Sequence, residues 1–148
     1  MKLVIQRVSE AKVTIDNKIN GQIDNGLVIL VGFIQEDNEL IIDKMINKLI
    51  NLRIFNDQED NMNLSLLDIK GSILSISQFT LYANIKKGNR PSLSESLNKE
   101  DANNLYNLFN LKLQAKNIDV QTGIFGSKMS VELINEGPVT IILDSKEV

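Results

Sequence analysis

The stretch Ile73–Leu81 (ILSISQFTL) changes from apolar to polar within one run of extended sequence. Its first half has the β-branched and aliphatic residues that are typical of a buried strand. Its second half contains two hydroxyls and an amide, at Ser77, Gln78 and Thr80. Burying such groups costs free energy unless each finds a hydrogen-bond partner. The sequence therefore predicts a core strand whose polar end forms the floor of a site.

The chain contains no histidine and no cysteine. Ser-His-Asp and Cys-His catalysis are therefore excluded, and so are zinc sites built from these ligands. Only carboxylates could bind a metal, and the acidic stretch Asp57–Asn61 lacks the glycine turn of a calcium loop. We expect no metal and no cofactor, and a solvated loop at Asp57–Asn61. The absence of cysteine agrees with a reducing compartment.

Length and composition indicate one ordinary globular domain over residues 1–148, with 43% hydrophobic and 24% charged residues. The longest apolar run, Leu27–Ile34, is too short to cross a bilayer, and the apolar start of the chain is too short for a signal peptide. We therefore expect a cytoplasmic protein without a membrane partner. The net charge is −3, so any contact with nucleic acid must come from a local basic patch.

Strands and turns are expected along most of the chain. The predicted strands lie at 4–8, 11–15, 27–34, 73–79, near Val120, at 129–134 and at 139–143. Asn20-Gly21 and Asn25-Gly26 are both turn signals of the kind found in hairpins.

Two amphipathic helices interrupt these strands. Apolar residues recur at helical spacing from Ile41 to Ile50, after a capping Asn38, and again from Ala102 to Leu113, after a capping Asn98. Because strands outnumber helices and the helices occur singly, the pattern predicts an α+β (mixed α/β) domain on a largely antiparallel sheet with two main helices.

Three features could take part in chemistry, and each has a structural alternative. Thr80 could attack an ester as a nucleophile, or could form only a structural hydrogen bond at the end of its strand. Gly137-Pro138 could be a simple turn, or a unit that presents backbone carbonyl oxygens to a ligand, with its X-Pro bond either trans or cis. Arg7 lies in phase with the apolar residues of the first strand. It is either buried against carbonyl or carboxylate acceptors or half-solvated on an edge strand.

The densest basic cluster is Lys86, Lys87 and Arg90, in a stretch that reads as a loop. It is either a nucleic-acid contact or a solvated loop. Lysines elsewhere could extend it if the fold brings them near, namely Lys112, Lys116 and Lys128. The stretch Gln121–Gly126 has two glycines around one aromatic residue, which is weak evidence for a phosphate-binding loop.

Taken together, these motifs resemble the D-aminoacyl-tRNA deacylase family. The resemblance covers essentially the whole chain, and its most specific parts are Ser77–Leu81 and Asn135–Thr140. Further matching stretches lie at Ile5–Val8, Arg53–Phe55, Met62–Leu64, Gly88–Ser92 and Gln121–Gly126. Two positions depart from the family pattern, with Leu93 where Phe is usual and Ser127 where Ala is common. These departures concern local loop packing and not the two main motifs.

The resemblance implies a barrel-like fold and a homodimer that hydrolyses the ester between a D-amino acid, or glycine mischarged on tRNA(Ala), and the 3′ end of tRNA. It implies pocket and catalytic positions at Ser77, Gln78, Phe79 and Thr80. The implied substrate-binding positions are Arg7, Phe125, Met129, Gly137 and Pro138, and the tRNA-binding ones are Lys86, Lys87 and Arg90.

The same resemblance implies a chiral filter. The Gly137-Pro138 unit of one subunit, with a cis peptide bond and oriented by Arg7, would lie beside the strand end of the other and exclude L-amino acids. Water or Thr80 could attack the ester, and we rank water first because no histidine is present to activate a hydroxyl. A non-catalytic RNA or DNA binder and a pure interaction module are the alternative classes.

Overall fold

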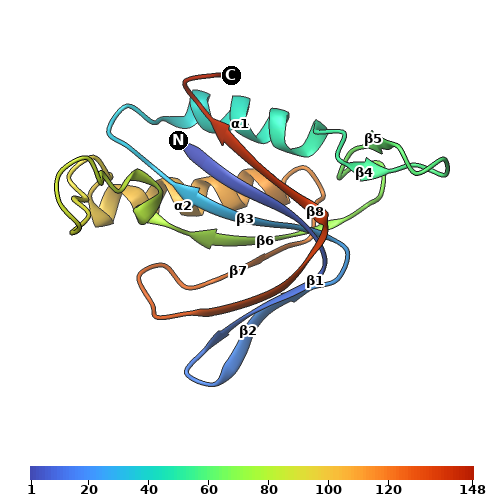
Figure 1. The fold of residues 1–148 in the computed structure, drawn as a ribbon, viewed down its shortest axis with the longest axis horizontal. Coiled ribbons are helices and arrows are strands. Elements are labelled where there is room, and N and C mark those ends of the chain that lie inside the picture. Colours follow the sequence, from blue (N-terminus) through green and yellow to red (C-terminus); the bar gives the residue numbers. More distant parts are fainter.

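The structure is a computed structural model that describes residues 1–148. The elements, in chain order, are β1 (Lys2–Ile15), β2 (Lys18–Ile23), β3 (Gly26–Gly32), α1 (Glu39–Asn51), β4 (Phe55–Asn56), β5 (Met62–Leu64), β6 (Ser72–Ser77), the 3-10 helix η1 (Phe79–Tyr82), α2 (Lys99–Gln114), β7 (Val120–Thr122) and β8 (Ser130–Asp144). Figure 1 shows a strongly twisted sheet with α1 and α2 packed against it.

The main sheet has six strands and is mixed. Strand β1 pairs antiparallel with β2, β3 and β8, whereas β3 pairs parallel with β6 and β6 pairs parallel with β7. The outer strands β2 and β7 approach each other, as the hydrogen bond from Asn20 Nδ2 to Thr122 O at 2.7 Å shows. The sheet is therefore nearly closed into a barrel, and the predicted mixed fold class with two main helices is confirmed.

Several predicted boundaries are wrong. The strands expected at 4–8 and 11–15 form the single strand β1, since both halves pair with β8. Asn20-Gly21 lies inside β2, and the chain reverses instead at Asp16 and Asn17, which have φ of 48° and 61°. The strands expected at 129–134 and 139–143 likewise form the single strand β8. The chain does bend at Asp24 and Asn25, but a hairpin there is wrong, because β2 and β3 each pair with β1 and not with each other.

Both predicted helix caps are confirmed. The Asn38 side chain accepts from Ile41 N at 3.2 Å, and the Asn98 side chain accepts from Asp101 N at 3.0 Å. The apolar sides of α1 and α2 pack on one face of the sheet, in a core of 22 buried residues that includes Leu3, Ile29 and Phe109. A second core of 7 buried residues, among them Val28 and Leu74, fills the other side of the sheet. Two opposite sheet faces are thus buried, as expected for the continuous apolar run of β3.

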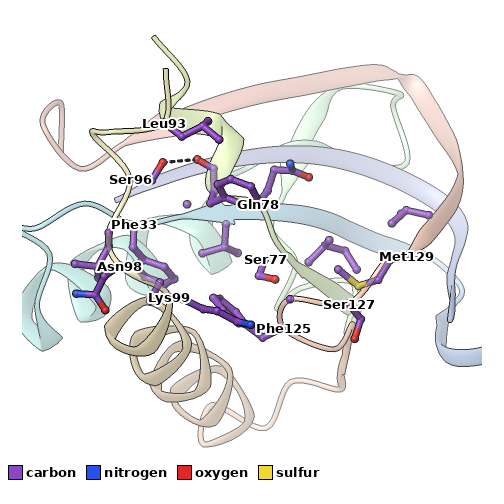
Figure 2. A pocket seen from close by; sticks show the side chains of 18 residues that line it. Phe33, Ser77, Gln78, Leu93, Ser96, Asn98, Lys99, Phe125, Ser127 and Met129 are labelled. Carbon is purple, nitrogen blue, oxygen red and sulfur yellow. Dashed lines mark hydrogen bonds between the residues drawn. The ribbon is translucent and has the colours of Figure 1, made fainter. Parts of the chain in front are cut away.

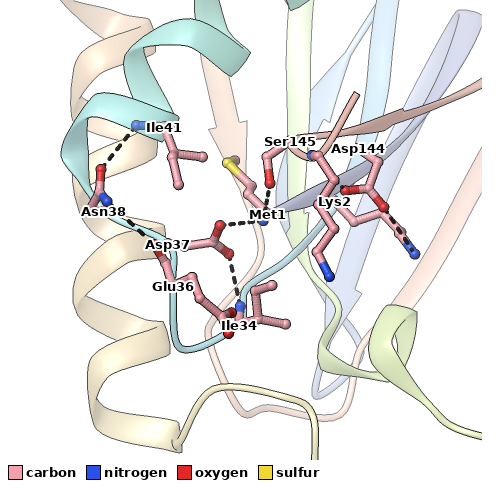
Figure 3. Close-up of polar contacts among 10 residues, drawn as sticks. Met1, Lys2, Ile34, Glu36, Asp37, Asn38, Ile41, Asp144 and Ser145 are labelled. Carbon is pink, nitrogen blue, oxygen red and sulfur yellow. Dashed lines mark hydrogen bonds and ion pairs between the residues drawn. The ribbon is translucent and has the colours of Figure 1, made fainter. Parts of the chain in front are cut away.

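Polar contacts at one end of the sheet join Met1, the loop before α1 and the residue that follows β8 (Figure 3). The α-amino group of Met1 donates to the Asp37 carboxylate and, at 2.7 Å, to Ser145 Oγ. Asp37 also accepts from Ile34 N at 2.8 Å, so one carboxylate connects β1 with the loop before α1. Burial lowers the pKa of the Met1 amino group. Neither α1 nor α2 has the length and apolar character needed to span a membrane.

Candidate active site

A cavity of about 720 Å³ lies at the carboxyl ends of the three parallel strands. Because β3, β6 and β7 run in the same direction, the residues that follow them meet at one edge of the sheet. Phe33 follows β3, Gln78 follows β6 and Phe125 follows β7, and all three line the cavity (Figure 2). This edge of a parallel sheet is where ligands commonly bind.

The cavity has mainly apolar walls and a few polar groups. Its apolar walls include Phe33, Leu93, Phe125 and Met129, and its polar groups are Ser77, Gln78, Ser96, Asn98, Lys99 and Ser127. The mixture of apolar walls with a few polar groups is typical of a site for a small organic ligand. The predicted site floor at the end of β6 is therefore part of a cavity.

Hydrogen bonds order the polar strand end. Gln78 Nε2 donates to Thr80 Oγ1, and Ser96 Oγ donates to Phe79 O at 2.9 Å. The second bond fixes the loop before α2 over the strand end. Thr80 does not line the cavity, and no carboxylate, lysine or arginine is among its hydrogen-bond partners. Its hydroxyl therefore has no contact with a group that could take its proton.

Tyr106 supports the opposite wall. Its ring packs against Phe125 with centroids 6.1 Å apart, and its hydroxyl donates to Ser75 O at 2.7 Å. Burial raises the pKa of Tyr106, so the hydroxyl stays protonated and keeps donating. The position of Phe125 is thus tied to the centre of β6.

The second motif, Gly137-Pro138, lies in an excursion of strand β8. Gln6 of β1 pairs with Thr140, but Val8 pairs with Asn135, so residues 136–139 bulge out opposite a single residue of β1. Asn135 Nδ2 donates to Arg7 O and to Val139 O, both at 3.0 Å, which closes the base of the excursion. The alternative of a simple turn is wrong, because β1 pairs with β8 on both sides of the motif.

Arg7 is buried beneath this excursion, with 6% of its surface exposed. It donates from Nη1 to Ile54 O at 2.7 Å and to Asn56 Oδ1 at 2.9 Å, and from Nε to Glu136 O at 3.3 Å. The half-solvated alternative for Arg7 is therefore wrong.

Gly137 is exposed and has φ of 115°, a backbone conformation that side chains disfavour. A Cβ at Gly137 would lie 2.8 Å from Arg7 Nη2, so only glycine fits over the guanidinium. The Gly137-Pro138 peptide bond is cis.

The structure brings only some of the predicted site residues together. Ser77, Gln78, Phe79, Phe125 and Met129 line the cavity, whereas Thr80, Arg7, Gly137 and Pro138 do not. Within one chain, the exposed Gly137-Pro138 unit is thus separate from the cavity that contains the strand end.

The basic cluster lies apart from the cavity lining. Lys86, Lys87 and Arg90 are exposed in the loop between η1 and α2, and none of them forms an ion pair. Lys112 does not extend the cluster, because it binds Glu39 and Asp43 of α1, each at 2.8 Å. The hydrogen bond to Asp43 is the main reason that the pKa of Lys112 is raised.

Sequence reasoning missed the cavity wall made by Phe33, Ser96, Asn98 and Lys99. Asn98 was expected only as a helix cap, and nothing in the pattern shows that the loop before it folds back over β6. No group of three or more carboxylates is placed to bind a metal. Asp57 instead accepts from the Glu59 and Asn61 amides of its own loop, and these bonds lower its pKa.

The sequence profile of the D-Tyr-tRNA(Tyr) deacylase family matches residues 4–144. The chain belongs to this family. Its members are aminoacyl-tRNA deacylases, which are hydrolases that act on ester bonds, so the expected enzyme class is confirmed. The cavity at the end of β6 is accordingly the candidate active site of a deacylase.

Two solved structures show the same fold over nearly the whole chain. A protein named "c-Myc DNA Unwinding Element Binding Protein" is 36% identical, with a TM-score of 0.91 over 97% of this chain and 98% of the other. A "probable eukaryotic D-amino acid tRNA deacylase" is 17% identical, with a TM-score of 0.83 over 96% of this chain and 97% of the other. The second likeness is evidence for the fold alone.

Proposed function

We propose that this deacylase hydrolyses the ester that joins a D-amino acid to the terminal adenosine of tRNA, and that it rejects L-aminoacyl-tRNA. The observation that supports this most is the separation of two motifs within one chain. A polar strand end lines a cavity, and an exposed Gly137-Pro138 unit lies elsewhere on a base fixed by Arg7. Family membership supports the ester chemistry.

The proposed active site is shared by two copies of the chain. Because Gly137-Pro138 is exposed and lies outside its own cavity, a second copy can place it beside Ser77–Phe79 of the first. A two-fold arrangement would then form two equivalent sites. Exposed apolar side chains on β8, Ile134 at 55% and Ile142 at 64%, offer surface for such an interface.

The proposed filter works by excluding the wrong substrate. The side chain of an L-amino acid would meet the carbonyl oxygens of the Gly137-Pro138 unit, whereas that of a D-amino acid would point away. Glycine has no side chain to clash, so glycine mischarged on tRNA(Ala) should also be hydrolysed. Discrimination of this kind comes from a penalty on the wrong ligand.

The proposed chemistry needs no imidazole or thiolate. Phe79 lines the cavity and begins η1, so its N–H group has no acceptor within that helix and can donate to the developing oxyanion. Water adds to the ester carbon, and the bond to the ribose oxygen breaks. The 2′-hydroxyl of the substrate assists proton transfer, and the products are the free D-amino acid and tRNA. Thr80, which accepts from Gln78, shapes the strand end.

The exposed cluster of Lys86, Lys87 and Arg90 is the proposed contact for tRNA phosphates, in a chain whose net charge is −3. We place the reaction in the cytoplasm, where aminoacyl-tRNA is used.

Incubation of the purified protein with matched D-tyrosyl-tRNA and L-tyrosyl-tRNA tests the proposal. We expect hydrolysis of the D-ester and survival of the L-ester. Gln78→Ala is a suitable variant, because it removes a cavity-lining amide that also orients Thr80. Equal hydrolysis of both esters, or of neither, would contradict the proposal.

A second candidate function is binding to a DNA element without ester hydrolysis. It is suggested by the name of the 36% identical relative. Saturable binding of DNA, together with intact D-tyrosyl-tRNA after incubation, would favour this function over the deacylase.

A further inference from the structure

Lys99 is the only charged residue in the lining of the cavity. No aspartate or glutamate lines the cavity, and Lys99 takes part in no ion pair. The other lining residues are apolar or neutral. The cavity therefore carries one positive charge without an ion-pair partner, on an exposed side chain at its wall.

The side chain of Lys99 lies along the cavity wall. Lys99 is the first residue of α2, and its Nζ would be 3.5 Å from a Cβ built on Gly126. Figure 2 shows the side chain extending toward Phe125. The neighbouring acidic residues Glu100 and Asp101 do not line the cavity, and the Asp101 carboxylate accepts from Asn98 Nδ2 at 2.6 Å. The ammonium group thus faces the space in which a ligand would bind.

A lone cation in this position favours a ligand with an anionic end and disfavours a ligand that puts an ammonium group there. An aminoacyl-tRNA end offers one group of each kind. The α-amino group of the amino acid is a cation, and the phosphodiester on the 5′ side of the terminal adenosine is an anion. Charge therefore orients the substrate, with the phosphate toward Lys99 and the amino acid toward the strand end at Ser77–Phe79.

We propose that Lys99 binds the phosphate that links the terminal adenosine to the preceding nucleotide, and so positions the ester at the strand end. This inference rests on the proposed function, since it takes aminoacyl-tRNA as the ligand. Lys99 is a positioning residue, because the phosphate is distant from the bond that breaks. Neither composition nor helical pattern singles it out from the other lysines.

The test compares substrates with and without the phosphate. The wild type and Lys99→Gln are assayed with D-tyrosyl-tRNA and with 3′-O-(D-tyrosyl)adenosine, which has no 5′-phosphate. We expect Lys99→Gln to lower kcat/KM for the tRNA by about threefold to tenfold, mainly through KM, and to leave the adenosine ester unchanged. Lys99→Arg should restore the tRNA value. Lys44→Gln is the control, because Lys44 is an exposed lysine of α1 that forms no ion pair and does not line the cavity.

Binding of AMP and of adenosine gives a readout that needs no turnover. The wild type should bind AMP more tightly than adenosine, and Lys99→Gln should bind the two equally. An equal loss of kcat on both esters, or no loss on either together with unchanged AMP binding, would overturn the assignment. If the wild type hydrolyses neither ester, the proposed deacylase fails, and the AMP comparison still decides whether Lys99 binds a phosphate.

Discussion

Replacing Arg7 with methionine should destabilise the fold and relax the rejection of L-substrates. Arg7 donates to three acceptors, Ile54 O, Asn56 Oδ1 and Glu136 O. Ile54 is buried, so its carbonyl would lose its partner without gaining water, whereas Asn56 and Glu136 are exposed and can be rehydrated. One buried acceptor left unpaired, together with the lost charged hydrogen bonds, amounts to about 2–4 kcal/mol of unfolding free energy.

Urea denaturation of Arg7→Met measures this cost, and Lys12→Met is the control. Lys12 is a cation on the same strand, but its 3.3 Å ion pair with Glu132 is solvated, with side chains 39% and 61% exposed. Such a pair contributes about 0–1 kcal/mol. Arg7→Lys retains the charge without the planar fork of donors and should fall between the wild type and Arg7→Met.

The functional readout is the ratio of D- to L-tyrosyl-tRNA hydrolysis, at a temperature where the Arg7 variants stay folded. A loss of about 1.4 kcal/mol in discrimination would change this ratio tenfold. The reasoning is refuted if Arg7→Met is as stable as Lys12→Met. It is also refuted if Arg7→Met and Arg7→Lys both keep the wild-type ratio although their stability falls.

Three further predictions concern other parts of the molecule. Changing Lys86, Lys87 and Arg90 together to glutamine should weaken tRNA binding and reduce its salt dependence by about one unit of slope per lost contact. If the triple variant binds tRNA as tightly as the wild type at several salt concentrations, the cluster is only a solvated loop. Thr80→Ala should keep measurable deacylation, because no group is placed to take the Thr80 proton; an aminoacyl group trapped on Thr80 and seen by mass spectrometry would show the opposite. Asp68→Asn should destabilise the protein near neutral pH but not at a pH below the lowered pKa of Asp68. Ser65 donates from Oγ and N to the Asp68 carboxylate, and these bonds lower the pKa of Asp68 below 3.8. The stabilisation from these bonds is present above pH 3.8 and is lost as the pH falls through the lowered pKa. A difference in urea midpoint between wild type and variant that does not change with pH would contradict this.

Sequence periodicity predicted the local elements well, because their causes are local. The caps Asn38 and Asn98 each accept from an amide three residues ahead, and the apolar stripes of α1 and α2 follow from helical spacing. The polar end of β6 was predicted for the same reason, since buried hydroxyl and amide groups cost free energy unless they are paired.

The strand and turn predictions that are wrong concern features set by long-range strand pairing. Nothing between residues 8 and 11 shows that β8 pairs with both halves of β1, so the sequence predicts two strands where the structure has one. Asn20-Gly21 reads as a turn, but its β2 neighbours pair with β1, and Asp16 and Asn17 adopt the left-handed conformation instead. The wall formed by Ser96 and Lys99 depends on the fold of a whole loop over the end of β6, which periodicity does not report.

A mixed-dimer experiment tests the central claim, that two chains share one chiral active site. Gly137→Ala should hydrolyse L-tyrosyl-tRNA, because a Cβ there would lie 2.8 Å from Arg7 Nη2 and displace the excursion. This variant is refolded with excess Gln78→Ala chain, whose strand end is damaged but whose Gly137-Pro138 unit is intact. The account predicts that L-hydrolysis per Gly137→Ala chain falls as the excess rises, while D-hydrolysis persists. An L-hydrolysis that does not change with the excess chain, or a Gly137→Ala protein that still rejects the L-ester, would contradict it.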